Sequence, residues 1–165
     1  AEFEIDKGPV LFYLGSSYEQ AARHLDRTDF FDRAVETFER LLEFNPNDSY
    51  ALNYLGYMYA DKGIRLEVAV DLLMRAISLE PENSAFLDSL GWAYFRLGQL
   101  QQAEQYLQQA LALMGEDELE EQAVIFDHAG DIASALGKEG EARMHWEKVL
   151  ELAPDNEEVR LKLTP

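Results

Sequence analysis

The stretch LDSLGWAYFRLGQLQQAEQYLQQALALMG, residues 87–115, decides the fold. Its first part places Leu87, Leu90 and Tyr94 on one face of a helix, because residues three and four apart share a helical face. The glycine after Leu90 needs a compensating reason, since glycine costs roughly 1 kcal/mol inside a helix relative to alanine. Close approach of a second helix at the small Ala103 supplies that reason. The stretch therefore predicts two helices that pack against each other.

The same order of residues occurs four times along the chain. The pair Leu14-Gly15 recurs as Leu55-Gly56 and Leu90-Gly91, and in a weaker form as Ala129-Gly130. Each pair is followed by an alanine with a large apolar residue four positions later, namely Ala34 and Phe38, Ala69 and Leu73, Ala103 and Leu107, and Ala142 and Trp146. A proline or glycine ends each unit. A fixed period of roughly 20–50 residues is typical of repeat architectures.

This order resembles the tetratricopeptide repeat, a helix-turn-helix unit of about 34 residues with the pattern Trp-x2-Leu-Gly-x2-Tyr, then Ala-x3-Phe-x2-Ala, then Pro. The consensus tryptophan is replaced here by other apolar residues, Leu11, Leu52, Leu87 and Phe126. One helix pair cannot bury its apolar face alone, so neighbouring pairs stack. The resemblance implies an all-α fold, a right-handed α-solenoid of four helix-turn-helix units plus a C-terminal helix.

The repeat pattern also predicts the segment boundaries. Repeat one spans residues 8–48 with an insertion at 23–29, repeat two 49–83, repeat three 84–122 with an acidic insertion near 115–121, and repeat four 123–156. Residues 1–7 are a tail or the end of a preceding repeat, with a cloning scar as an alternative, and residues 157–165 are a capping or truncated helix. The chain is either a fragment of a longer repeat protein or a complete four-repeat array.

Two local features refine these segments. The seven inserted residues of repeat one equal two helical turns, so they can lengthen the helix pair without rotating its apolar stripe. Prolines end three of the units, and the polar residues that follow them, Asp48, Asn83 and Asn156 among them, are expected to cap the next helix.

Charge and composition exclude several classes of partner. Acidic residues outnumber basic ones 32 to 14, which gives a net charge of −18, and the basic residues are scattered. Such a field repels a phosphate backbone, so we expect no nucleic acid partner. No stretch approaches the roughly 20 apolar residues that cross a bilayer, so we expect no direct membrane insertion. The chain has no cysteine, so its redox compartment cannot be inferred from disulfides or free thiols.

The sequence predicts no enzyme, metal site or cofactor. None of His24, His128 and His145 has a second histidine at the spacing of a helical metal pair. His128 is expected to be an ordinary polar residue on a helix surface. The acidic run at 116–121 lacks the alternating aspartates and central glycine of a calcium loop, and no nucleophile elbow or phosphate loop occurs.

The resemblance also implies a binding surface. In this family, peptides are held by the second, fifth, ninth and twelfth residues of each repeat, which lie on the first helix and face away from the second. Together with the neighbouring cation Arg96, the expected peptide groove comprises Phe12, Ser16, Tyr50, Asn53, Tyr57, Asp88, Trp92, Phe95, Arg96, Asp127 and Asp131. Trp92 is expected to be an exposed anchor, with packing on the adjacent repeat as the alternative, and Trp146 is expected in the core.

The expected groove is aromatic and acidic, so a basic or apolar segment fits it better than an acidic tail. Relatives that clamp a C-terminal carboxylate use lysine or arginine at the fifth position, where this chain has Phe12, Asn53, Asp88 and Asp127. We therefore expect a non-enzymatic scaffold or adaptor that binds a basic or apolar peptide segment in its concave groove. Two alternatives are open, namely a self-association module and the recruitment domain of a larger enzyme.

The repeats narrow the resemblance further. Residues 51–57, 87–92 and 127–131 look like the last repeats of long bacterial tetratricopeptide proteins, several of which are envelope lipoproteins that act as adaptors. The resemblance is compatible with a location either in the bacterial cytoplasm or in the periplasm.

Overall fold

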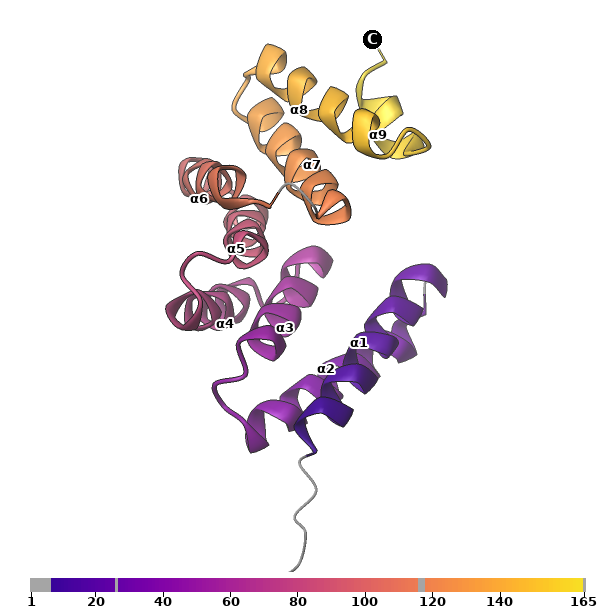
Figure 1. Cartoon of the computed structure of the whole chain (residues 1–165), viewed down its shortest axis with the longest axis vertical. Coiled ribbons are helices and arrows are strands. Elements are labelled where there is room, and N and C mark those ends of the chain that lie inside the picture. Colours follow the sequence, from indigo (N-terminus) through magenta and orange to yellow (C-terminus); the bar gives the residue numbers. More distant parts are fainter. Residues whose placement is uncertain (1–6, 26, 116–117, 165) are drawn as a thin grey trace, which may run out of the picture. The chain divides into compact units, whose positions relative to one another are not determined.

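The helices follow the predicted helix-turn-helix order. The computed structural model describes residues 7–25, 27–115 and 118–164. These residues form the helices α1 Gly8–Leu25, α2 Thr28–Phe44, α3 Ser49–Lys62, α4 Leu66–Leu79, α5 Ser84–Arg96, α6 Leu100–Leu113, α7 Leu119–Ala135, α8 Glu139–Leu152 and α9 Glu157–Lys162 (Figure 1). Helices α1 to α8 pair in chain order, and α9 packs on α8. The predicted all-α fold of four helix pairs plus a C-terminal helix is confirmed.

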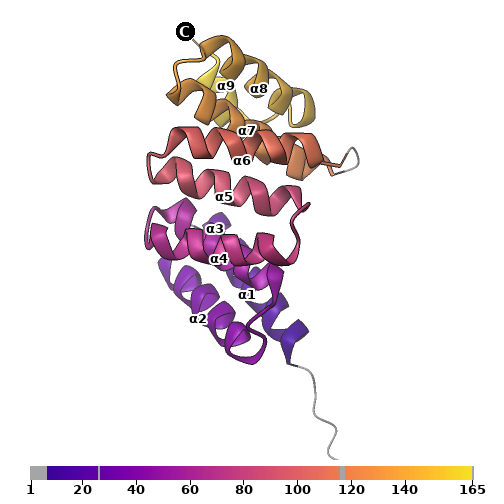
Figure 2. The same ribbon diagram turned by 90° about the vertical axis from the view of Figure 1, so that its left-hand side faces the viewer.

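The chain divides into two compact units, Ala1–Leu79 and Glu80–Pro165. In the first unit, α3 packs against both α2 and α1. In the second unit, α7 packs against both α6 and α5, and Figure 2 shows α5, α6 and α7 side by side. In each unit, therefore, the first helix of the later repeat lies against both helices of the earlier one.

The predicted caps begin three of the helices. Asp48, Asn83 and Asn156 precede α3, α5 and α9, and each side-chain oxygen accepts a hydrogen bond from the backbone N–H three residues later, at 3.0, 3.2 and 3.0 Å respectively. Such a cap satisfies one of the donors that a helix start leaves unpaired and contributes about 1 kcal/mol.

The two insertions affect the helices differently. Helices α1 and α2 have 18 and 17 residues, whereas α3 and α4 have 14 each, so the insertion at 23–29 lengthens both helices of repeat one. Helix α7 begins at Leu119, ahead of the predicted repeat boundary at 122–123, with Glu120 and Glu121 in its first turn. Carboxylates are favourable at that end of a helix. Residues 116–117 of the acidic insertion, residue 26, residues 1–6 of the predicted tail and residue 165 lie outside the described residues.

Each repeat glycine makes room for a bulky side chain of the paired helix. A Cβ atom built on the glycine would meet Phe38 at 2.9 Å from Gly15, Leu73 at 2.6 Å from Gly56, Leu107 at 2.0 Å from Gly91 and Trp146 at 2.3 Å from Gly130. The expected approach of Ala103 to Gly91 involves its carbonyl oxygen, which lies 3.2 Å from the same Cβ position. The glycine is thus a socket for the large residue four positions after the alanine, and not chiefly for the alanine itself.

Trp146 lies in the core of the second unit, as predicted. It is 8% exposed and belongs to a buried cluster with Ala142 and Val149 of its own helix and Val159 of α9. The C-terminal helix is therefore part of the core of this unit.

Candidate protein-binding surface

Asp88 does not face an open channel. It is 4% exposed, and each of its carboxylate oxygens lies 2.9 Å from Nδ1 of His128 on α7. His128 is itself buried, so the expectation of a surface histidine is wrong. The reason is that the aspartate of the preceding repeat supplies a partner that lets a polar ring be buried.

The ionisation of this pair follows from its surroundings. Burial lowers the pKa of His128. The charge and the hydrogen bond of Asp88, together with smaller contributions from Asp127 and Asp131, outweigh this effect, so the pKa is raised overall. The carboxylate of Asp88 thus stabilises the protonated form of the imidazole relative to the neutral form.

Trp92 packs on the adjacent repeat. Its ring stacks on His128 with 4.1 Å between centroids and 15° between planes, and on Phe95 at 4.9 Å. The guanidinium of Arg96 lies 5.8 Å from the ring centroid. Nε1 of Trp92 is buried and has no hydrogen-bond partner among the described residues. The packing alternative therefore replaces the exposed anchor, because the indole and Asp88 together form the surface on which His128 rests.

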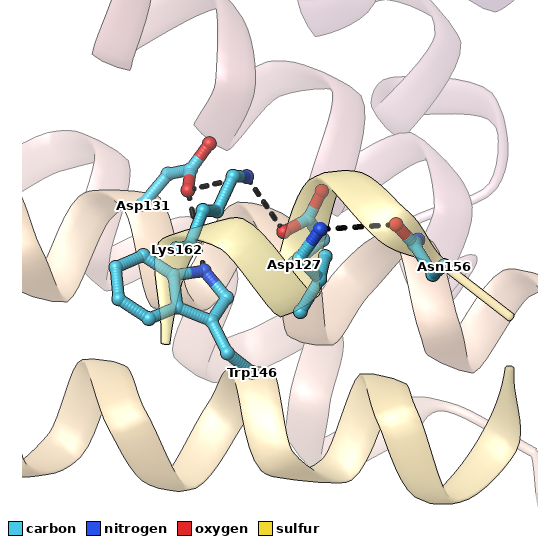
Figure 3. A network of polar contacts seen from close by, with 6 residues as sticks. Asp127, Asp131, Trp146, Asn156 and Lys162 are labelled. Carbon is cyan, nitrogen blue, oxygen red and sulfur yellow. Dashed lines mark hydrogen bonds and ion pairs between the residues drawn. The ribbon is translucent and has the colours of Figure 1, made fainter. Parts of the chain in front are cut away.

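Asp127 and Asp131 already hold a cation of this chain. Nζ of Lys162 on α9 donates to Oδ1 of Asp127 at 2.8 Å and to Oδ1 of Asp131 at 2.7 Å (Figure 3). Oδ1 of Asp131 also accepts from Nε1 of Trp146 at 3.3 Å. Burial raises the pKa of Asp127 although Lys162 opposes this effect. The two groove aspartates expected in repeat four are therefore partly neutralised within the second unit, because they share one lysine.

One rule unites these contacts. The side chain at the sixth position of a repeat contacts the side chain at the fifth or ninth position of the preceding repeat. We call this the seam contact. In the first unit the ring of Tyr54 meets Phe12 edge to face at 5.5 Å. In the second unit the incoming residues are His128 and Lys162. The contacts of His128 and Lys162 were not predicted, although both residues share one position with Tyr54 in the aligned repeats.

The predicted residues of the first unit lie on a more accessible surface. Tyr50 is 49% exposed, while Phe12, Ser16 and Tyr57 are partly exposed. Asn53 is buried, and its Oδ1 has no hydrogen-bond partner among the described residues.

A cleft of about 140 Å³ opens beside Tyr57 in the first unit. Its lining is Glu19, Ala22 and Arg23 of α1, Phe31 of α2, and Tyr57, Met58, Asp61 and Lys62 of α3. Arg23 donates to Oε1 of Glu19 at 2.5 Å, and Nζ of Lys62 lies 5.7 Å from the centroid of the Phe31 ring. The cleft thus combines an apolar wall with charges of both signs, and its size suits one apolar side chain with a polar flank.

Other chemistry is not evident in the described part of the chain. Residues 7–25, 27–115 and 118–164 contain no group of three or more His, Asp or Glu side chains placed to hold a metal ion. No helix within these ranges is long and apolar enough to cross a membrane.

Most of the chain matches models of one protein family. Three models described as tetratricopeptide repeat match residues 18–64, 84–117 and 124–156. The TPR repeat-containing protein PA4667 of Pseudomonas aeruginosa is 47% identical over 66 residues, which make up 40% of this chain and 11% of that protein. The match therefore spans about a tenth of the length of that bacterial relative.

Solved structures show the same fold. The APC/C hetero-tetramer Cut9-Hcn1 has a TM-score of 0.81 at 18% identity, covering 94% of this chain and 29% of that one. PilF of Pseudomonas aeruginosa has a TM-score of 0.71 at 19% identity, covering 93% and 67%. The first TPR of Spaghetti (RPAP3), solved with an HSP90 peptide, has a TM-score of 0.61 at 29% identity, covering 70% and 89%. The fold class is the all-α solenoid of helix pairs.

Proposed function

The chain belongs to the tetratricopeptide repeat family of protein-binding modules, and from this premise we propose that it is a non-enzymatic adaptor that holds a segment of a partner protein on the first helices of its first unit. The observation that carries this proposal is the cleft beside Tyr57, the ninth residue of repeat two. The cleft is also lined by Glu19, which is the twelfth residue of repeat one and so stands at another of the positions that hold peptides in the family.

The second unit is less suited to a ligand at the equivalent positions. Asp88 and Trp92 are engaged by His128, and Asp127 and Asp131 are engaged by Lys162. A basic ligand would have to displace Lys162 from two charge-assisted hydrogen bonds, which are among the stronger polar contacts in proteins.

The cleft favours a segment with an apolar or aromatic side chain next to a basic one. The wall formed by Phe31, Tyr57 and Met58 suits the apolar side chain, and a flanking cation would share the carboxylate of Glu19 with Arg23. An acidic C-terminal tail is disfavoured, because the fifth positions in this unit are Phe12 and Asn53 rather than lysine or arginine. Aromatic anchors supply most of the binding energy in such interfaces.

Selection of a random peptide library on the intact chain tests the proposal. We expect enriched sequences to pair an apolar or aromatic residue with lysine or arginine, and Tyr57→Ala to weaken their binding at least about tenfold. Tyr13→Ala is the matched control, because Tyr13 is 70% exposed on the same unit and does not line the cleft. Enrichment of acidic C-terminal sequences, or equal binding to Tyr57→Ala, would contradict the proposal.

A further inference from the structure

The insertion in repeat one supplies part of the lining of the cleft on which the proposed function rests. In repeat two, α3 ends at Lys62, and Gly63 follows with a φ of 68°. Glycine readily adopts this left-handed conformation, which commonly ends a helix. The aligned position in repeat one holds Ala22, and α1 continues through residues 22–25. We call these four residues the extra turn, and two of them, Ala22 and Arg23, line the cleft.

Aromatic contacts hold the lengthened helices of repeat one together. The ring of Phe30 on α2 stacks on that of Tyr18 on α1, with 6.2 Å between centroids and 25° between planes. The guanidinium of Arg27 lies 5.1 Å from the centroid of the Phe30 ring. Phe31 aligns with the first residue of α4, so Phe30 belongs to the residues that the insertion adds to α2. The two helices are therefore packed against each other next to the cleft, and such packing keeps a binding surface in one geometry.

The ion pair between Arg23 and Glu19 offers a donor and an acceptor side by side. Nε and Nη2 of Arg23 donate to the same oxygen, Oε1 of Glu19, at 3.0 and 2.5 Å. The other oxygen of Glu19, Oε2, accepts no hydrogen bond from the part of the chain that the structure describes. A guanidinium has five N–H donors, so Arg23 has N–H groups beyond the two that Glu19 engages.

The charges that line the cleft balance one another. Glu19 and Asp61 are acidic, and Arg23 and Lys62 are basic, although the chain as a whole has a net charge of −18. A bound carboxylate would meet two carboxylates as well as two cations. A main-chain carbonyl is an uncharged acceptor and meets no such repulsion. The lining thus suits a peptide backbone next to an apolar side chain.

We propose that the extra turn determines which segment the cleft accepts, with Ala22 setting the size of the apolar side chain and Arg23 donating to a main-chain carbonyl beside it. This inference rests on the proposed function and describes what the same cleft recognises. Ala22 is the smallest residue that lines the cleft, so a larger side chain there takes up space that the ligand otherwise fills. Oε2 of Glu19 remains for the flanking cation of the segment.

Selection of the random peptide library on Ala22 variants tests the role of this residue. We expect Ala22→Leu to select smaller apolar residues than the parent chain does, and Ala22→Gly to select larger ones. Two versions of a selected peptide, with phenylalanine or valine at the apolar position, quantify the change, and their affinity ratio should shift at least about tenfold. His24→Leu is the matched control, because His24 lies on the same extra turn, is exposed and does not line the cleft.

Arg23→Lys tests the contact with the main chain. This change keeps a positive charge beside Glu19 but removes the planar fork of N–H donors. We expect all selected peptides to bind more weakly by a similar factor, about fivefold, with the same sequences selected, because every peptide has main-chain carbonyls. Arg40→Lys is the control, since Arg40 is an exposed arginine of the same unit that does not line the cleft.

Two results would overturn the inference and leave the proposed function intact, provided that Tyr57→Ala still weakens binding. One is an unchanged choice of apolar residue in both Ala22→Leu and Ala22→Gly. The other is unchanged affinity in Arg23→Lys, or a loss confined to peptides with an acidic residue. If circular dichroism shows that Ala22→Leu is unfolded, Ala22→Gly decides. Equal binding by the parent chain and Tyr57→Ala would overturn both proposals.

Discussion

Nδ1 of His128 lies 2.9 Å from both carboxylate oxygens of Asp88, so a buried hydrogen bond joins α7 to α5, and it becomes an ion pair when the imidazole is protonated. Trp92 covers the imidazole from one side. Removing one partner of a buried pair leaves an uncompensated charge and typically costs about 3–5 kcal/mol. The stability of the second unit should therefore depend on this pair and on pH.

The pH dependence has a definite sign. Because the pKa of His128 is raised in the folded chain, its protonation stabilises the fold fully below the unfolded value of about 6.5, and this contribution is lost as pH rises through the folded-state pKa. We expect the difference in unfolding free energy between the parent and His128→Gln to be larger at pH 6 than at pH 9. Urea denaturation at both pH values measures it, and a difference independent of pH would refute the assignment.

Trp92→Ala should destabilise the chain, because Trp92 stacks on His128 and Phe95. We expect a loss of about 2 kcal/mol, smaller than the roughly 3–5 kcal/mol for Trp146→Ala in the core. Chemical denaturation of the two variants measures both losses. Unchanged stability of Trp92→Ala would instead support an exposed role for this side chain.

Gly91→Ala should destabilise the second unit, since the added Cβ would lie 2.0 Å from Leu107 and 3.2 Å from the carbonyl oxygen of Ala103. We expect a cost of about 1–3 kcal/mol from overpacking, and a larger cost for Gly91→Leu. Gly140→Ala is the control: nothing lies within 4 Å of its Cβ position in α8, so the gain in helix propensity should stabilise the chain slightly. Thermal melting of these variants separates the two outcomes.

Lys162→Ala should loosen α9, because Asp127 and Asp131 lose their shared donor. We expect a cost of about 1–2 kcal/mol, typical of hydrogen bonds to charged groups that are only partly exposed. Hydrogen exchange of the Val159 amide, which Asn156 caps, should accelerate. Lys148→Ala removes an exposed pair with Glu151 and should leave this exchange unchanged. Equal effects of the two variants would show that Lys162 contributes no more than a surface charge.

Periodicity was sufficient to predict the helix pairs, because apolar spacing, socket glycines and caps are local in sequence. It predicted Trp146 in the core for the same reason, since this residue occupies the position of Phe38 and Leu107. The beginning of α7 was less predictable, because the acidic insertion breaks the period just before it.

The partners of the acidic residues could not be predicted from periodicity. A family pattern assigns a position to a face of a helix, but whether Asp88 meets solvent or a histidine depends on one residue of the next repeat. His128 and Lys162 look like ordinary polar residues in the sequence, and their roles follow only when repeats are placed next to each other. Binding of a peptide at the predicted groove positions stays a prediction.

The seam contacts have a consequence for how such a chain can evolve and assemble. Copies made by duplication could in principle stack in any order, and repeat proteins are prone to misassembly between like units. Here one seam joins phenylalanine to tyrosine, another aspartate to histidine, and a third a pair of aspartates to lysine. Exchanging repeats would bury a charge without its counterpart, so the order of the repeats is itself encoded in the chemistry of their junctions.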